Sequence, residues 1–219
     1  MIDYAKIFRD ATVTIEHEND HHDVGNKVIS GPLLQRLLDQ AMTPDQRSES
    51  WYTIRNKASG GARIDLFSDI GEGGVTAKDF VNQLNSLSGP IDLHVNSAGG
   101  SLFDGLAIVA ALKAYPSKVT AFVDGMAASI ASVIAVSCDK LYMAPSARLY
   151  IHDAHAEASG NAAAMGKMGE LLDGASDDLA AIYAAKAGGT VASWRATMRN
   201  EKYYTAPQAV AAGLCDGIR

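Results

Sequence analysis

Residues 119–136 read VTAFVDGMAASIASVIAV, and this segment decides the fold. The β-branched and aromatic residues from Val119 to Val123 indicate a buried strand. Gly125 marks a turn, and the small residues from Ala128 to Val136 indicate a helix that packs closely on a sheet. Ser129 lies in the first turn of this helix, where neighbouring alanines leave its hydroxyl open. The segment therefore predicts a strand, a turn and a helix, with a serine near the junction.

The same arrangement occurs just before this segment. Ile91–Val95 predicts a strand, Asn96–Gly100 a turn, and Phe103–Ala114 a helix. Repeated strand–helix units are typical of an α/β domain with largely parallel strands. Further strands are predicted at 63–67, 141–143 and 148–151, and further helices at 76–87 and 165–186.

The first 50 residues differ from the rest of the chain. Leu33–Ala41 predicts a short amphipathic helix, and the polar segment Thr43–Ser50 indicates a linker. We therefore divide the chain into an N-terminal extension and linker, residues 1–50, and a domain formed by residues 51–219.

Composition excludes some classes of partner. The chain has 219 residues, 47% of them hydrophobic, and a formal net charge of −6 without clustered basic residues, which argues against nucleic-acid binding. Charges in Met1–Asp10 argue against a secretory signal, and the most apolar stretch, Gly125–Cys138, is shorter than the roughly 20 residues of a membrane span. We expect a cytoplasmic protein without membrane contact.

A reactive serine needs a histidine as general base and an acid that orients this histidine. His152 directly follows the predicted strand 148–151, and strand ends beside helix starts are where α/β folds place their sites. Backbone N–H groups at the start of a helix can also bind an anion. From these residues alone, the Ser129 and glycine turns remain compatible with close packing, and His152 with a structural role. A dinucleotide turn would need a third glycine, and Gly105 lies too far along the chain.

The remaining histidines and the cysteines are weaker candidates. His94 lies inside a predicted strand and His155 in a polar loop. The spacing of His17 and His21, beside His22, is open to a metal site, but such a polar run is more typical of a solvated loop. Cys138 and Cys215 have neither metal-site nor disulfide spacing, and Cys138 is expected to be a small core residue. We predict no metal and no cofactor.

Several ordered motifs in residues 51–219 resemble the Clp protease proteolytic subunit (ClpP-like serine peptidases), and the branch of bacteriophage head maturation proteases in particular. The motifs are Asn96–Gly100, Asp124–Ser129, Arg148–His152, Thr205–Pro207 and the run from Ala209 to Leu214. The resemblance implies a ClpP/crotonase-like α/β spiral of strand–helix units with a long protruding handle made of a helix and a strand. It also implies a serine endopeptidase.

The resemblance assigns roles by position. Ser129 matches the nucleophile, His152 the base, and Gly100 and Ile130 the residues whose N–H groups form the oxyanion hole. Glu201 stands where Clp subunits have the triad aspartate, and its additional methylene changes its reach; Asp153 is the rival acid. A substrate strand is expected to pair along Gly99 and Gly100.

The resemblance also implies partners. Polypeptides would be the substrates, and the chains would form a homo-oligomer, such as a heptameric ring or stacked rings, with residues 153–166 between rings. In the phage branch the substrates would be scaffold and capsid proteins; in an ATP-dependent Clp protease a AAA+ unfoldase would be the partner. Ala98 replaces a proline common in the Clp turn, and residues 1–50 do not resemble the short Clp segment that contacts an ATPase. Two other classes stay open, a crotonase-type acyl-CoA hydratase or thioesterase and a non-catalytic assembly component.

Overall fold

The computed structural model describes residues 50–71 and 74–219. The helix predicted at Leu33–Ala41 and the histidines of the extension lie outside the described residues. Those predictions, together with the boundary near Ser50, therefore stay predictions.

The described residues form an eight-stranded mixed sheet with the order β1-β2-β3-β4-β5-β8, and β6 pairs both β4 and β7. The edge strand β1 is antiparallel to β2, and β7 is antiparallel to β6, whereas the other pairs are parallel. Parallel neighbours need crossover connections, which the helices supply. The strands are β1 (Tyr52–Asn56), β2 (Ala62–Phe67), β3 (Ile91–Ser97), β4 (Val119–Ala128), β5 (Lys140–Met143), β6 (Arg148–Ile151), β7 (Lys202–Thr205) and β8 (Gly217–Ile218).

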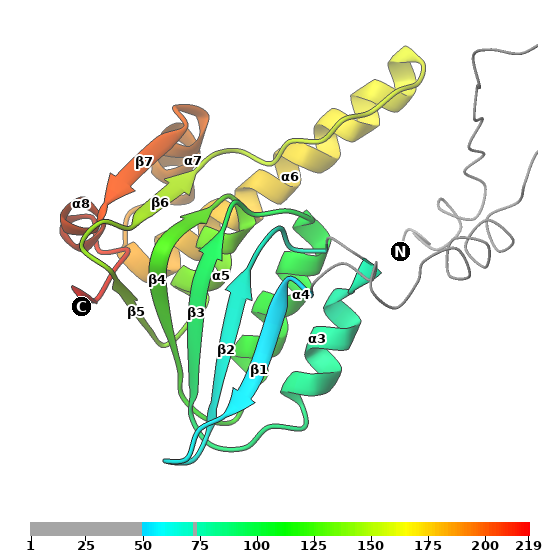
Figure 1. Ribbon diagram of the computed structural model, residues 1–219. Helices are drawn as coiled ribbons and strands as arrows, with labels where there is room; N and C mark the ends of the chain where they lie inside the picture. The colour runs from blue at the N-terminus through cyan, green and yellow to red at the C-terminus, as the bar shows by residue number, and fades with distance from the viewer. Residues whose placement is uncertain (1–49, 72–73) are drawn as a thin grey trace, which may run out of the picture. The chain divides into compact units, whose positions relative to one another are not determined.

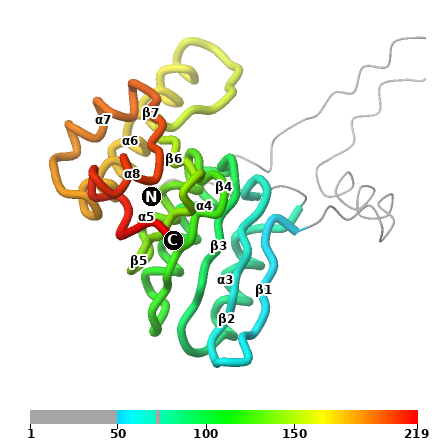
Figure 2. Tube along the Cα trace, turned by 60° about the vertical axis from the view of Figure 1, so that its left-hand side comes forward, coloured from blue at the N-terminus to red at the C-terminus, as the bar shows by residue number. Residues whose placement is uncertain are grey.

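Six helices are formed by the described residues, and α3, α4 and α5 lie along one face of the sheet (Figure 1). Helices α4 and α5 begin shortly after β3 and β4 end, as expected for a domain of strand–helix units. Figure 2 shows β6, β7, α7 and α8 gathered at one end of the sheet and β1 and β2 at the other. The helices are α3 (Ala77–Leu84), α4 (Leu102–Ala114), α5 (Ile130–Ser137), α6 (Ala162–Ala187), α7 (Val191–Arg199) and α8 (Ala206–Ala211).

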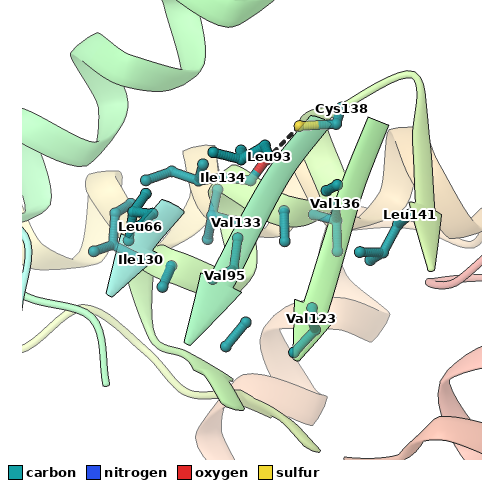
Figure 3. Close-up of a cluster of buried hydrophobic side chains, with 14 of the residues drawn as sticks. Leu66, Leu93, Val95, Val123, Ile130, Val133, Ile134, Val136, Cys138 and Leu141 are labelled. Atoms are coloured by element: carbon teal, nitrogen blue, oxygen red, sulfur yellow. Dashed lines mark hydrogen bonds between the residues drawn. The ribbon is translucent and has the colours of Figure 1, made fainter. Parts of the chain in front are cut away.

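The core lies between the sheet and helix α5. All residues of α5 from Ile130 to Val136 are buried, against Leu93 and Val95 of β3 and Val123 of β4 (Figure 3). Cys138 belongs to this core: its thiol donates to the Ile134 carbonyl at 3.4 Å, and burial raises the pKa of the thiol to about 12. A thiol held protonated in this way is inert, which agrees with its predicted role as a small core residue.

Strand β4 changes partner halfway along its length. Residues 120–123 pair β5, whereas Met126–Ala128 pair β6. The register against β3 shifts from Val95↔Val123 to Ser97↔Ala127, which leaves two additional residues on β4. The side chain of Asn96 fills this bulge, because its Oδ1 accepts from the Met126 N–H at 3.1 Å. Gly125 is required here, since a Cβ would lie 2.5 Å from the same Asn96 oxygen.

Helix α6 extends beyond the sheet, and the chain that follows β6 runs beside it (Figure 1). Its buried residues all come from the second half, from Ala175 to Tyr183, whereas the residues from Ala162 to Glu170 are exposed or half-buried. The predicted ClpP-like α/β fold with a protruding helix is confirmed, whereas the segment 152–161 beside this helix is irregular rather than the strand expected in the handle.

Some local predictions need correction. The turn expected at Asp124–Ala128 is strand, because β4 continues through a bulge and Gly125 serves the bulge rather than a chain reversal. The helix expected from Ala128 begins at Ile130, and Ser129 is its N-cap. The antiparallel edge strand β1 was not predicted, because its central residues are mostly exposed and carry little hydrophobic pattern.

Asp216 joins β5, α6 and the start of β8. It accepts from Lys140 Nζ at 2.8 Å, Lys186 Nζ at 2.7 Å and the Leu141 N–H at 2.8 Å. Burial alone would raise the pKa of this carboxyl, but the three hydrogen bonds outweigh burial and lower the pKa to about 2. The carboxylate therefore stabilises the fold where it is ionised.

We expect Asp216→Asn to lower the free energy of unfolding at pH 7 by on the order of 2 kcal/mol. Because the folded pKa lies below the unfolded one, this contribution is complete above pH ~4 and disappears as the pH falls toward ~2. Urea unfolding at several pH values measures it, with the exposed Asp178→Asn on α6 as control. If wild type and Asp216→Asn differed as much in free energy of unfolding at pH ~2 as at pH 7, the ionised Asp216 carboxylate would not be the source of the stability.

Gly105 of α4 is expected to resist substitution because of close packing. A Cβ at this position would collide with Cγ1 of Ile130, whereas nothing lies within 4 Å of a Cβ at the helical Gly169. Overpacking costs roughly 1–3 kcal/mol, which exceeds the ~0.5–1 kcal/mol that alanine contributes in a helix. Gly105→Ala should therefore lower the free energy of unfolding and Gly169→Ala should raise it; equal effects in denaturant titration would refute the packing argument.

Candidate active site

Ser129 lies between β4 and α5 in a strained backbone conformation, with φ 53° and ψ −132°. Among the described residues other than glycine, a positive φ occurs at Ser68, Ser129 and Glu201. Such conformations cost about 1–3 kcal/mol each and persist where surrounding structure fixes them. The N–H of Ser129 donates to the Tyr150 carbonyl at 2.9 Å, which joins this turn to β6.

The hydroxyls of Ser132 and Tyr183 form a buried pair that supports the Ser129 turn. Ser132 Oγ donates to the Ser129 carbonyl at 2.6 Å and lies 2.7 Å from the Tyr183 hydroxyl of α6. Burial raises the pKa of Tyr183. The sequence analysis did not single out this pair, which connects the serine turn to the protruding helix.

The tandem glycines at the end of β3 are placed against Ser129. A Cβ on Gly99 would lie 2.7 Å from Ser129 Cβ and 3.3 Å from its Oγ, and a Cβ on Gly100 would collide with the backbone of Ile70. Their φ angles, 118° and 126°, also favour glycine. This close approach explains why a side chain is excluded at both positions.

Two backbone N–H groups are available beside the serine hydroxyl. Ile130 is the first residue of α5, so its N–H has no acceptor within the helix. Gly100 lies in a parallel bridge with Ile70. In this bridge the Ile70 N–H donates to the Gly99 carbonyl and the Ser101 N–H donates to the Ile70 carbonyl, so the Gly100 N–H is not used. Both residues line the same cavity as Ser129.

Gly99 differs from Gly100 in the use of its polar groups. Its carbonyl accepts from Ile70 N–H at 2.7 Å, and its N–H donates to Ser97 Oγ at 3.1 Å. Ser97 is buried and also donates to the Ser68 carbonyl at 2.7 Å. Of the two glycines predicted to pair with a substrate strand, Gly99 therefore has both polar groups occupied, and Gly100 is the better placed.

His152 follows the last residue of β6 and lies in the cavity that holds Ser129. Its Nδ1 lies 2.6 Å from the Asp153 carbonyl oxygen, and no hydrogen bond joins it to Ser129 in the described structure. Catalytic hydrogen bonds often form only in the complex with substrate, so this geometry leaves His152 available as base. The cavity has a volume of about 330 Å³ and is lined by Ala98, Gly100, Leu102, Ser129, Ile130, Tyr150, His152, Asp153, Ala154, His155 and Leu179.

His155, which the sequence analysis set aside as a loop residue, lies in this cavity too. Its ring centroid is 4.9 Å from that of His152. His94, by contrast, is bound to Asp124, with Nδ1 and Oδ2 2.8 Å apart, and does not line the cavity. In residues 50–71 and 74–219 no group of His, Cys, Asp and Glu side chains could hold a metal ion.

Glu201 directly precedes β7, and His152 directly follows β6. The antiparallel pairing ends at Ile151↔Lys202, so His152 and Glu201 are the next residues beyond the last pair. The Glu201 carboxylate, however, accepts a hydrogen bond from the Tyr150 hydroxyl at 3.2 Å. Tyr150 could have been found from strand alternation, because it lies two residues before His152 and so shares its face.

Asp153, the rival acid, has one carboxylate oxygen bound to arginines, whereas its buried Oδ1 has no hydrogen-bond partner among the described residues. Its Oδ2 lies 3.3 Å from Arg195 Nη2 and 3.7 Å from Arg199 Nε. Arg195 is only 5% exposed and also binds Asp173 and Asp177 of α6 at 2.6 Å each. The carboxylate of Asp153 therefore fastens the segment after His152 to α6 and α7.

The cavity brings together the groups that serine hydrolases use: a serine in a strained strand-to-helix turn, a histidine, and two backbone N–H groups. The chain belongs to the Clp protease family, whose family model matches residues 46–219. Among the described helices, none has the length and apolar character of a membrane span.

Individual relatives agree with this membership. The chain is 31% identical over 131 residues to ATP-dependent Clp protease proteolytic subunit 1 of Leifsonia xyli, a match that covers 59% of this chain and 66% of the relative. It is 31% identical over 130 residues to proteolytic subunit 2 of Rhodococcus jostii, covering 58% of this chain and 67% of the relative. The proteolytic subunit of Ligilactobacillus salivarius is 32% identical over 130 residues, covering 58% and 66%. The matches thus span about two thirds of the relatives' own length.

Proposed function

We propose that this chain is a serine endopeptidase in which Ser129 attacks the peptide carbonyl and His152 accepts its proton. The observation that carries the proposal is the position of Ser129, strained and half-buried in one cavity with His152 and with the N–H groups of Gly100 and Ile130. Membership in the Clp protease family supports the same reaction class.

The oxyanion of the tetrahedral intermediate would be bound by the N–H groups of Gly100 and Ile130. Both are backbone donors in a fixed frame, and such preorganised donors stabilise developing charge without having to reorient. The first N–H groups of α5 also carry the positive end of the helix dipole. After acyl transfer, His152 would return its proton to the leaving amine.

Glu201 is proposed as the acid that orients His152. It lies next to the last paired position of the β6–β7 register, as His152 does, whereas one oxygen of the Asp153 carboxylate is held by Arg195 and Arg199. For Glu201 to bind the imidazole, His152 Nδ1 must leave the Asp153 carbonyl.

The substrates are proposed to be polypeptides and the working form a homo-oligomer, as in Clp proteases. The first half of α6 supports the homo-oligomer, because it extends away from the sheet and leaves the apolar side chain of Met165 38% exposed. A second copy of the chain would cover this side chain. The relatives are named as subunits of ATP-dependent proteases, which favours a partner ATPase of the AAA+ class. A role in phage head maturation stays a prediction from the resemblance alone.

We expect Ser129→Ala to abolish peptidase activity and labelling by a fluorophosphonate, because the nucleophilic oxygen is lost. The Ser129 side chain is outside the hydrogen bonds that hold the turn, so the oligomer should persist by light scattering. Ser137→Ala, at the other end of α5, should label normally. Labelling of the Ser129→Ala protein at the wild-type rate would exclude Ser129 as nucleophile.

Glu201→Gln should keep the shape of the side chain but remove the charge that stabilises the imidazolium. We expect kcat to fall by about 10²–10⁴ on a small peptide ester. Asp153→Asn should change kcat by less than about tenfold, since its carboxylate serves Arg195. If Asp153→Asn is the impaired enzyme and Glu201→Gln is nearly normal, the acid has been assigned wrongly.

A further inference from the structure

Four side chains come together where the pairing of β6 and β7 ends: Tyr150 and Tyr203 within it, and His152 and Glu201 directly beyond it. Residues directly opposite in an antiparallel pair share a face, as do residues two apart on one strand. Tyr150 pairs Tyr203, and the pairing ends at Ile151↔Lys202, so His152 and Glu201 are the residues directly beyond it. Tyr150 lies beside both the proposed base and the proposed acid.

The contacts on this face connect the tyrosine of β6 to both catalytic candidates. The Tyr150 ring is stacked on Tyr203, with centroids 4.2 Å apart, and its centroid lies 5.2 Å from that of His152. Its hydroxyl donates to Glu201 Oε2 at 3.2 Å. Burial first, and the bond to Glu201 second, raise the pKa of Tyr150, so the hydroxyl stays a donor at neutral pH. The stacked rings fix the direction of this donor.

Glu201 needs such a partner more than an aspartate would. A glutamate has one more rotatable bond than an aspartate, and each freely rotating bond reduces the fraction of time spent in a productive geometry. The backbone of Glu201 is fixed, with φ 47° and its N–H bonded to the Met198 carbonyl at 2.9 Å, but its side chain is exposed. A hydrogen bond to one carboxylate oxygen leaves the other oxygen free for an imidazole N–H.

We propose that Tyr150 is a positioning residue whose hydroxyl holds one oxygen of Glu201, so that the other oxygen can orient His152. The proposal rests on the proposed function of Ser129, His152 and Glu201 as a triad. Tyr150 touches no reacting atom in this scheme and acts only through Glu201. It offsets the additional methylene that glutamate brings to this position.

The test is the variant Tyr150→Phe, which keeps the ring and its stacking and removes only the hydroxyl. We expect kcat on a small peptide ester to fall about 5- to 30-fold, with KM changed less than about twofold, because a mobile carboxylate orients the base less often. Tyr203→Phe is the matched control: its ring belongs to the same stack, it is 59% exposed, and Glu201 accepts from Tyr150 instead. This control should retain wild-type kcat.

A double-mutant cycle shows whether Tyr150 acts through Glu201. In a Glu201→Ala background, adding Tyr150→Phe should change the residual rate by less than about twofold. A purely structural role would lower the rate by the same factor in both backgrounds, together with the melting temperature. Equal factors in both backgrounds, or an unchanged or raised kcat in Tyr150→Phe alone, would overturn the proposal.

Fluorophosphonate labelling separates this proposal from the one on which it rests. If wild type does not label at Ser129, the proposed triad fails and the Tyr150 proposal fails with it. If wild type labels, Glu201→Ala slows labelling, and Tyr150→Phe labels as fast as wild type, only the role of Tyr150 is wrong.

Discussion

The site depends on the bulge in β4, where two additional residues turn the strand from β5 toward β6. Asn96 holds this bulge by accepting from the Met126 N–H, and Gly125 leaves room for the Asn96 side chain. Without the shift, β4 would end beside β5 and Ser129 would not be bonded to Tyr150 of β6. Bulges that redirect a strand next to a site are a recurrent device. The Asn96 side-chain amide, in the neighbouring strand β3, thus holds the bulge that brings β4 beside β6.

The cost of the strained residues is met by the polar groups around them. Ser68, Ser129 and Glu201 have positive φ, and each lies next to a specific hydrogen bond: from Ser97 Oγ to the Ser68 carbonyl, from Ser132 Oγ to the Ser129 carbonyl, and from the Glu201 N–H to Met198. A buried hydroxyl without a partner would itself cost about 1–3 kcal/mol. Ser97 and Ser132 therefore contribute to the site because their hydroxyls donate to the carbonyls of strained residues. Two of the three strained residues, Ser129 and Glu201, are members of the proposed triad, and such strain often occurs at functional sites.

Much of the fold was predictable because the decisive signals are local. The strands at 91–95 and 119–123, the small-residue helix after Ser129 and the position of His152 after a strand follow from periodicity and composition. The segment 124–128 was wrongly expected to be a turn, because Gly125 has the same signature in a turn and in a bulge, and its meaning depends on Asn96, 29 positions earlier. The contact between Tyr150 and Glu201 could not be predicted, because β6 and β7 are separated in the sequence by helices α6 and α7. Long-range pairing fixes how the predicted residues meet.

The orientation of His152 is coupled to the protruding helix through its neighbour. Nδ1 of His152 and the Asp153 carbonyl are in contact, and the Asp153 carboxylate is bound by Arg195, which also binds Asp173 and Asp177 of α6. The Ala154 N–H donates to Ser176 Oγ at 2.9 Å, a second bond from the same segment to α6. Any displacement of α6 relative to β6 therefore moves the carbonyl that now holds the imidazole. Glu201, by contrast, lies between α7 and β7, so the proposed acid and the carbonyl that now holds His152 are attached to different elements of the fold.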